Sequence, residues 1–178
     1  SQADTDIVDD DASNLTWNLA GPTDIDEGET GTYTVSYTGV TLAPGQTATV
    51  TVGSADLAGG DTDAEAGTDY TTLSTVLTFT GGGATQQTVT VSTVEDTVLE
   101  GTEDFRVTLG GQSVGSLGTS QADTDIVDDD ASNLTWNLAG PTDIDEGETG
   151  TYTVSYTGVT LAPGQTATVT VGSADLAG

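Results

Sequence analysis

The side chains in this chain that could do chemistry are almost all carboxylates. The 178 residues include 29 acidic residues and one base, Arg106, with no histidine and no cysteine. Most of the acids fall into four groups, at residues 24–29, 61–69, 95–104 and 128–130. Oxygen ligands without nitrogen or sulfur ligands suit Ca²⁺, which accepts about six to eight oxygens from separate loops. The acidic groups therefore predict bound calcium.

The repulsion within such groups also favours a bound cation. In an antiparallel sandwich alternate loops lie at the same end, so several of the acidic groups are expected to share one pole of the domain. Two like charges about 4 Å apart repel by roughly 4 kcal/mol at an effective dielectric near 20. The repulsion of several such pairs would be as large as the whole stability of a domain, unless a bound divalent ion replaced it by attraction.

Composition excludes other classes of function. The formal net charge of −28 disfavours nucleic acid and anionic membrane surfaces, and no apolar run is long enough for membrane insertion by this segment. Without histidine, cysteine or lysine, only a paired-carboxylate hydrolase using Glu100 and Glu103 is conceivable. We therefore expect no enzyme and no small-molecule substrate.

The elements that must position the carboxylates are β-strands. Apolar residues alternate with Thr, Ser, Asn or Gln, and Gly, Pro or Asp clusters separate the alternating runs. No segment has a helical apolar stripe. The expected strands are 14–20, 31–38, 46–53, 73–80, 86–94, 103–110 and 122–128. We predict an all-β fold, an immunoglobulin-like antiparallel β-sandwich of about seven strands that occurs as a tandem repeat.

The sequence repeats itself. Residues 1–59 recur without change as residues 120–178, which gives a period of 119 residues (120 − 1). Identity at solvent-facing positions exceeds what a shared fold requires. We expect residues 1–12 to be the tail of a preceding repeat, 13–131 a complete repeat, and 132–178 the amino-terminal half of a following one. Only about three residues separate the last strand of one repeat from the next, so neighbours should stay in contact.

This window contains two copies of the first half of the repeat and one copy of the second half. Three interpretations of the surplus half remain open: an excerpt of a longer array, pairing of surplus halves with each other, or completion by a separate fragment. Residues 60–178 also contain every element once, so a circularly permuted closure competes with the linear one.

Several segments together resemble the Calx-β motif, which is named from sodium/calcium exchangers and recurs in bacterial surface proteins. They are Asp26-Glu27-Gly28, Asp61, Ala66-Gly67-Thr68-Asp69-Tyr70, residues 91–105 and Ile126-Val-Asp-Asp-Asp130. The resemblance implies calcium ligands at the following positions: Glu27, Asp61, Asp96, Glu100, Glu103, Asp128, Asp129 and Asp130. Asp69 is as consistent with a turn as with a ligand.

The identical tandem copies, the acidity and the Thr/Gly-rich strands also resemble the extender repeats of giant calcium-dependent bacterial adhesins of the RTX type. That resemblance implies a secreted protein at the bacterial cell surface, in which several Ca²⁺ ions per repeat stiffen the junctions between neighbouring identical repeats. A distant adhesive region would then be projected away from the cell.

Other interpretations remain open. The acidity alone fits a surface kept hydrated in a saline environment. A calcium-sensing regulatory module, as in the exchangers, is the first functional alternative. Direct binding of ice or glycan through rows of threonine is the second, although threonine is also simply a good strand former on a solvent face.

Overall fold

The computed structural model describes residues 4–5, 11–57 and 64–175, which form two units by their contacts. Unit 1 comprises residues 1–95 and 102–127, and unit 2 comprises residues 96–101 and 128–178. No helix in the described ranges is long and apolar enough to cross a membrane. The predicted bounds of the repeats, 1–12, 13–131 and 132–178, stay a prediction, and each unit is described by itself below.

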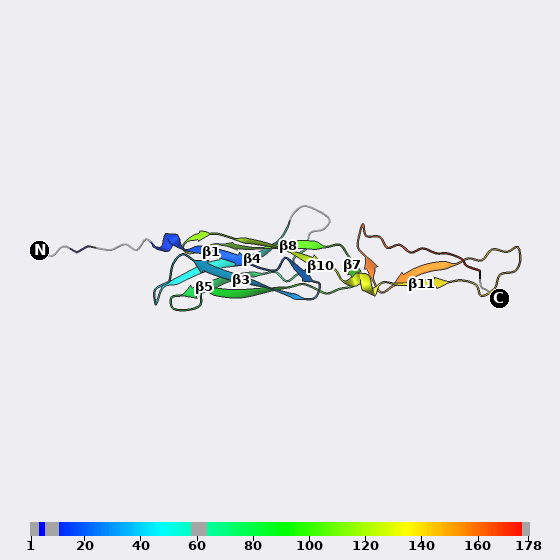
Figure 1. Ribbon diagram of the computed structural model, residues 1–178, viewed down its shortest axis with the longest axis horizontal. Helices are drawn as coiled ribbons and strands as arrows, with labels where there is room; N and C mark the ends of the chain where they lie inside the picture. The colour runs from blue at the N-terminus through cyan, green and yellow to red at the C-terminus, as the bar shows by residue number, and fades with distance from the viewer. Residues whose placement is uncertain (1–3, 6–10, 58–63, 176–178) are drawn as a thin grey trace. The chain divides into compact units, whose positions relative to one another are not determined.

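Unit 1 is a sandwich of two β-sheets (Figure 1). One sheet has the order β6-β3-β1-β9, and the other has the order β2-β10-β8-β4-β5. The elements are η1 (Asp11–Asn14), β1 (Thr16–Ala20), β2 (Asp24–Asp26), β3 (Thr30–Thr38), β4 (Thr47–Asp56), β5 (Ser74–Thr80), β6 (Gln86–Ser92), β8 (Glu103–Gly110), β9 (Ser116–Leu117) and β10 (Gln121–Val127).

The strands form where the sequence alternates, because one face of each is buried between the sheets. In β3, Tyr33, Val35 and Tyr37 are buried while the threonines and serine between them are more exposed. Each of the seven expected strands is present, so the predicted all-β sandwich is confirmed. The short strands β2 and β9 were not expected.

The core of unit 1 is organised around three aromatic rings. Trp17 and Tyr37 come from one sheet and Phe79 from the other, with ring centroids 5.2–5.8 Å apart in edge-to-face geometry. The Trp17 indole N–H donates a hydrogen bond to the Val114 carbonyl at 2.9 Å. The first and second halves of the repeat therefore complete one another in this core.

A buried chain of hydrogen bonds links the two sheets. The Tyr33 hydroxyl contacts the Thr124 hydroxyl at 2.7 Å, and Thr124 donates to the Pro22 carbonyl at 2.9 Å, so Tyr33 is the donor of the first bond. Burial raises the pKa of Tyr33. The neutral phenol therefore persists in the folded state and satisfies Thr124, which is itself fully buried.

The chain enters unit 1 at one end of the sandwich and leaves at the other. Thr16 at the start of β1 pairs with Ser116 of β9, and Val127 at the end of β10 pairs with Asp26 at the end of β2. Both pairings are parallel, so the first strands and the last strand run in the same direction. The end of β10, from which the chain continues to the acidic residues 128–130, thus lies at the pole opposite Thr16.

This arrangement explains why the second half of the repeat folds with the copy of the first half that precedes it, and not with the copy that follows it. In the permuted closure, the chain would run from Val127 back to Thr135, the counterpart of Thr16. Eight residues reach at most about 29 Å when fully extended, whereas the ten residues from Thr16 to Asp26 rise about 33 Å in strand geometry. The permuted connection is therefore too short unless strand pairs are broken.

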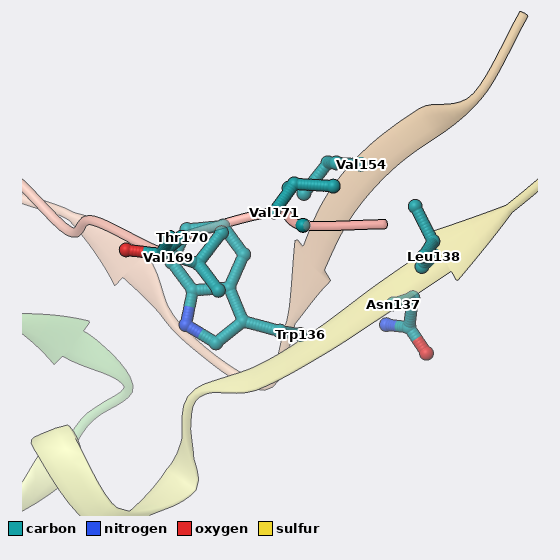
Figure 2. Close-up of a pocket in the computed structure, with 8 residues that line it drawn as sticks. Trp136, Asn137, Leu138, Val154, Val169, Thr170 and Val171 are labelled. Carbon is teal, nitrogen blue, oxygen red and sulfur yellow. The ribbon is translucent and has the colours of Figure 1, made fainter. Parts of the chain in front are cut away.

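Unit 2 contains the second copy of the first half. Its elements are β7 (Val98–Leu99), η2 (Asp130–Asn133), β11 (Thr135–Ala139), β12 (Thr153–Thr157) and β13 (Thr160–Leu161). Strands β11 and β12 pair antiparallel, with Trp136 opposite Tyr156. Side chains of this hairpin and of residues 169–171 line an open cavity (Figure 2).

Strand β7 pairs with β13 in parallel, although in sequence it lies just before β8 of unit 1. The Thr160 N–H donates to the Thr97 carbonyl at 2.8 Å, and the Ala162 N–H donates to the Leu99 carbonyl at 3.1 Å. Residues 96–101 therefore fold with the following copy of the repeat, which the sequence did not indicate.

The Thr160→Pro substitution should loosen residues 96–101, because proline removes the amide that donates to Thr97. We expect a local loss of about 1–3 kcal/mol, measured as faster hydrogen exchange at Ala162. Thr41→Pro is the matched control. It lies in the identical sequence context, and in the described ranges the Thr41 N–H makes no hydrogen bond. Equal effects at both positions would contradict a role for the β7–β13 pair.

Candidate metal centre

In unit 1, Glu27 lies in a tight turn at the end of β2. Its N–H donates to the Val127 carbonyl at 3.0 Å, and the Glu29 N–H donates to the Asp26 carbonyl at 3.2 Å. Gly28 has φ +75°, and a Cβ there would lie 2.6 Å from a carboxylate oxygen of Glu95. Glycine is required at this position for both reasons, so the backbone brings the acidic group 24–29 close to Glu95.

Thr93, the residue that follows β6, fixes the same turn. Its buried hydroxyl donates to the Asp26 carbonyl at 2.8 Å and accepts the Glu29 N–H at 3.0 Å. This contact, made by a threonine 64 residues further on, has no signal in the sequence. It holds the half-buried Glu27 in a defined position before any ion binds.

A second pair of acids in unit 1 is Asp69 with Glu103. Each offers a carboxylate oxygen, and these oxygens lie within 4.8 Å of each other. One oxygen of Asp69 also accepts the Glu65 N–H at 2.6 Å. Asp69 thus has the predicted turn role and, in addition, the position of a ligand beside Glu103, the first residue of β8.

Next to Asp69, Tyr70 is buried and stacks on Phe105 with ring centroids 4.4 Å apart. Its hydroxyl donates to a carboxylate oxygen of Asp56 at 2.6 Å. Burial first, and then the Asp56 carboxylate, raise the pKa of Tyr70 well above its usual value. Tyr70 therefore remains a neutral hydrogen-bond donor to Asp56.

In unit 2, residues 96–101 and 128–133 form one carboxylate centre. Asp128 accepts two backbone amides, one from Glu100 and one from Asp130, the latter at 2.7 Å. Asp96 accepts the Val98 N–H at 2.6 Å. Asp96 and Asp130 each offer a carboxylate oxygen, and these two oxygens lie within 4.8 Å of each other.

Asp130 is the most unusual residue of this centre, because its side chain is fully buried. One carboxylate oxygen, Oδ1, accepts the Asn133 side-chain N–H at 2.8 Å. The other, Oδ2, is buried and has no hydrogen-bond partner among the described residues. A buried carboxylate oxygen without a partner is costly, and a bound cation would satisfy it. The donor set therefore fits calcium.

The other predicted ligands lie as follows. Asp129 precedes η2, is exposed, and makes no capping hydrogen bond with its side chain. Asp61 lies outside the described residues. Glu27 and Glu103 belong to unit 1, while Asp96, Glu100, Asp128 and Asp130 are brought together in unit 2. The assignment of these residues as ligands stays a prediction.

The covalent chain itself links the acidic segments. It passes between the units at three places, after residues 95, 101 and 127. Each passage lies within or beside one of the acidic groups 95–104 and 128–130. Carboxylates of the two units are therefore only a few residues apart in the sequence.

The only basic side chain is used elsewhere. Arg106 lies on β8 and makes two hydrogen bonds to Asp123 of β10, at 2.5 and 2.7 Å. Arg106 thus pairs with an acid on the neighbouring strand. The guanidinium holds the pKa of Asp123 below its usual value, which stabilises the fold above the unfolded pKa and is lost as pH falls. The side chains of Arg106 and Asp123 are 33% and 51% exposed, so water screens the pair and its contribution is small.

Comparison with known proteins supports this description. The family profile of the Calx-beta domain matches residues 38–130. The crystal structure of the apo form of the Calx CBD1 domain is similar to the chain at a TM-score of 0.57 and 25% identity, over 65% of this chain and 98% of that one. A second similar structure is the calcium binding domain CBD12 of CALX1.1, at a TM-score of 0.54 and 25% identity, over 65% of this chain and 44% of that one. A comparison with curated protein sequences gives no match.

Proposed function

The chain belongs to the Calx-beta domain family, and from this membership we propose that it is a calcium-dependent extender of a secreted bacterial surface adhesin. In this proposal, several Ca²⁺ ions per repeat stiffen the junctions between neighbouring identical repeats. The array then projects a distal adhesive region from the cell surface. Calx-beta domains serve regulation or structure rather than catalysis, which agrees with the expectation of no enzyme.

The observation that carries the calcium part is the buried Asp130, whose Oδ2 has no partner in the described part of the chain. Asp96 offers an oxygen within 4.8 Å of an oxygen of Asp130. With Asp128 beside them, these carboxylates would hold the ion, and Asp69 with Glu103 could contribute at a second position. When bound, calcium supplies positive charge that neutralises the repulsion between the acids.

Oxygen donors decide which metal is expected. The centre contains only carboxylates and backbone groups, and the chain has no histidine or cysteine. Zinc and copper prefer nitrogen and sulfur ligands, whereas calcium accepts irregular sets of oxygens at about 2.3–2.6 Å. Extracellular calcium modules commonly have a Kd of about 10⁻⁴–10⁻³ M, which suits a structural ion outside the cell.

Two features support the extender role. The verbatim repeat adds length without adding a new binding surface. The three passages of the chain between the units lie within or beside the acidic groups, which is where calcium-dependent junctions would need their carboxylates. Without calcium, repulsion between the carboxylates would instead favour bent or open junctions.

Small-angle X-ray scattering of the intact chain tests the stiffening. In calcium, we expect a longer maximum dimension and a narrower distribution of conformations than in chelator. Asp130→Asn should lose this response, whereas Asp143→Asn should keep it because Asp143 is exposed in unit 2 and is not a predicted ligand. A maximum dimension that does not change with calcium would rule out the extender mechanism.

The second candidate function is a calcium sensor. It is favoured by the similarity to a structure described as a calcium binding domain, CBD12 of CALX1.1. A sensor requires a Kd of about 10⁻⁷–10⁻⁵ M, which calorimetric titration with Ca²⁺ distinguishes from the weaker binding of an extracellular module. Many identical sensors in series would add little, so the repeat favours the extender.

A further inference from the structure

Asp130 is held at its main chain and at its side chain by different neighbours. Its N–H donates to Oδ1 of Asp128 at 2.7 Å, and Oδ2 of Asp128 accepts the Glu100 N–H. On the side chain, Oδ1 of Asp130 accepts an N–H of the Asn133 amide at 2.8 Å. All four residues belong to unit 2. Two separate contacts therefore fix the position and the direction of one buried carboxylate.

The contact with Asn133 decides where the second oxygen of Asp130 points. Rotation of an aspartate carboxylate about χ2 has broad, roughly two-fold minima, so the torsion alone does not fix the two oxygens. Because a carboxylate is planar, a hydrogen bond that holds Oδ1 also fixes Oδ2 on the other side of the group. Oδ2 is buried and has no hydrogen-bond partner in the part of the chain that the structure describes. Asn133 thus holds this oxygen in place for a cation.

The chemistry of an asparagine side chain suits this role. Its amide donates a hydrogen bond without carrying a charge, so Asp130 keeps its full negative charge. A lysine or arginine at position 133 would instead form an ion pair with Asp130 and compete with a metal ion. Since the N–H of Asn133 faces Asp130, the effect of Asn133 on an ion passes through that carboxylate.

The backbone of Asn133 is fixed by the hairpin that follows it. Its carbonyl oxygen lies against Gly158, where an added Cβ would lie only 2.0 Å from that oxygen. Gly158 also has φ +102°, a conformation that favours glycine. Gly158 comes directly after β12, so the end of that strand supports the residue that orients Asp130.

We propose that Asn133 is a positioning residue of the calcium centre, which orients Asp130 toward the ion without binding the ion itself. This role rests on the calcium part of the proposed function and adds a residue outside the predicted ligands. Hydrogen-bond partners that orient a metal ligand typically change metal affinity by about 10–100-fold when they are removed. Asn133→Ala should therefore raise the Kd for Ca²⁺ by about 10–100-fold, although every predicted ligand is still present.

Hydrogen exchange of the intact chain over a range of calcium concentrations measures this Kd. The amides of Glu100 and Asp130 report on the centre itself, because both donate to Asp128. Asn14→Ala is the matched control, since Asn14 has the identical sequence context one period earlier and belongs to unit 1. It should leave the Kd unchanged. In chelator, Asn133→Ala removes a donor from a buried carboxylate, so the Asp130 amide should exchange faster.

A combined substitution separates orientation of Asp130 from a general loosening of the segment. In a chain that carries Asp130→Ala, Asn133 has no carboxylate to orient, so adding Asn133→Ala should change the Kd by no more than about twofold. The full effect in that background would overturn the role of Asn133, as would an equal effect of Asn14→Ala. An unchanged Kd in the single Asn133 variant would overturn it as well, while leaving calcium binding intact. If the unaltered chain showed no response to calcium, the proposed function itself would fail.

Discussion

Asp130→Asn should weaken calcium binding while stabilising the same segment when calcium is absent. In calcium the substitution removes a charged ligand, and we expect the Kd to rise by about tenfold or more. In chelator it removes a buried negative charge whose Oδ2 has no partner in the described ranges, which should stabilise by about 1 kcal/mol or more. If Asp130 had only a structural role and bound no calcium, the substitution would change stability in the same direction in calcium and in chelator.

Hydrogen exchange at two amides gives the local readout. The N–H groups of Glu100 and Asp130 both donate to the Asp128 carboxylate, so their exchange reports on the centre itself. Free calcium at about 100 times its Kd should slow their exchange by about 100-fold, equivalent to about 2.7 kcal/mol. Asp143→Asn, at an exposed position outside the predicted ligands, is the control and should leave the response intact. Unchanged exchange on calcium addition would contradict binding at this centre.

Trp17→Ala is expected to destabilise unit 1 by about 3–5 kcal/mol. Trp17 is fully buried, packs against Tyr37 and Phe79, and donates to the Val114 carbonyl. Because domains of this size are stable by only about 5–15 kcal/mol, the change should remove a large part of that stability. Urea denaturation of the intact chain, followed by circular dichroism, measures the loss.

Trp136→Ala provides a control in identical sequence. The residue has the same neighbours along the chain, but it lines an open cavity and has no ring equivalent to Phe79 against it in the described structure. We expect a loss of about 1 kcal/mol or less, because little apolar area is lost from a buried site. Equal losses at Trp17 and Trp136 would mean that unit 2 holds a closed core after all.

The seven long strands could be predicted because each has one buried face, which leaves a period-two pattern in the sequence. Strands β2, β7 and β9 could not, since two or three residues are too few to show a period. They also pair in parallel with distant partners, as Val98 does with Thr160. Pairing of this kind depends on where the rest of the fold places the chain ends.

The acidic segments of the candidate site could be predicted from the sequence, but the role of each residue in them could not. Three consecutive aspartates, 128–130, look alike in sequence, yet Asp128 accepts two amides, Asp129 is exposed and Asp130 is buried. The short η2 turn, in which Asn133 donates to Asp130, decides which of the three turns inward. Asp69 acquires its place beside Glu103 only because the fold brings the two loops together.

The parallel pairing of β2 with β10 determines how unit 1 would bear a pulling force. Tension along the chain draws the first strands toward the amino end and β10 toward the carboxyl end. Because Asp24–Asp26 and Asp125–Val127 run in the same direction side by side, their hydrogen bonds lie across the pull and are loaded together in shear. Strands loaded in this way do not unzip one bond at a time, and the lifetime under load follows the rate of unfolding. Each repeat would therefore act as a tension-bearing link whose strength comes from strand direction.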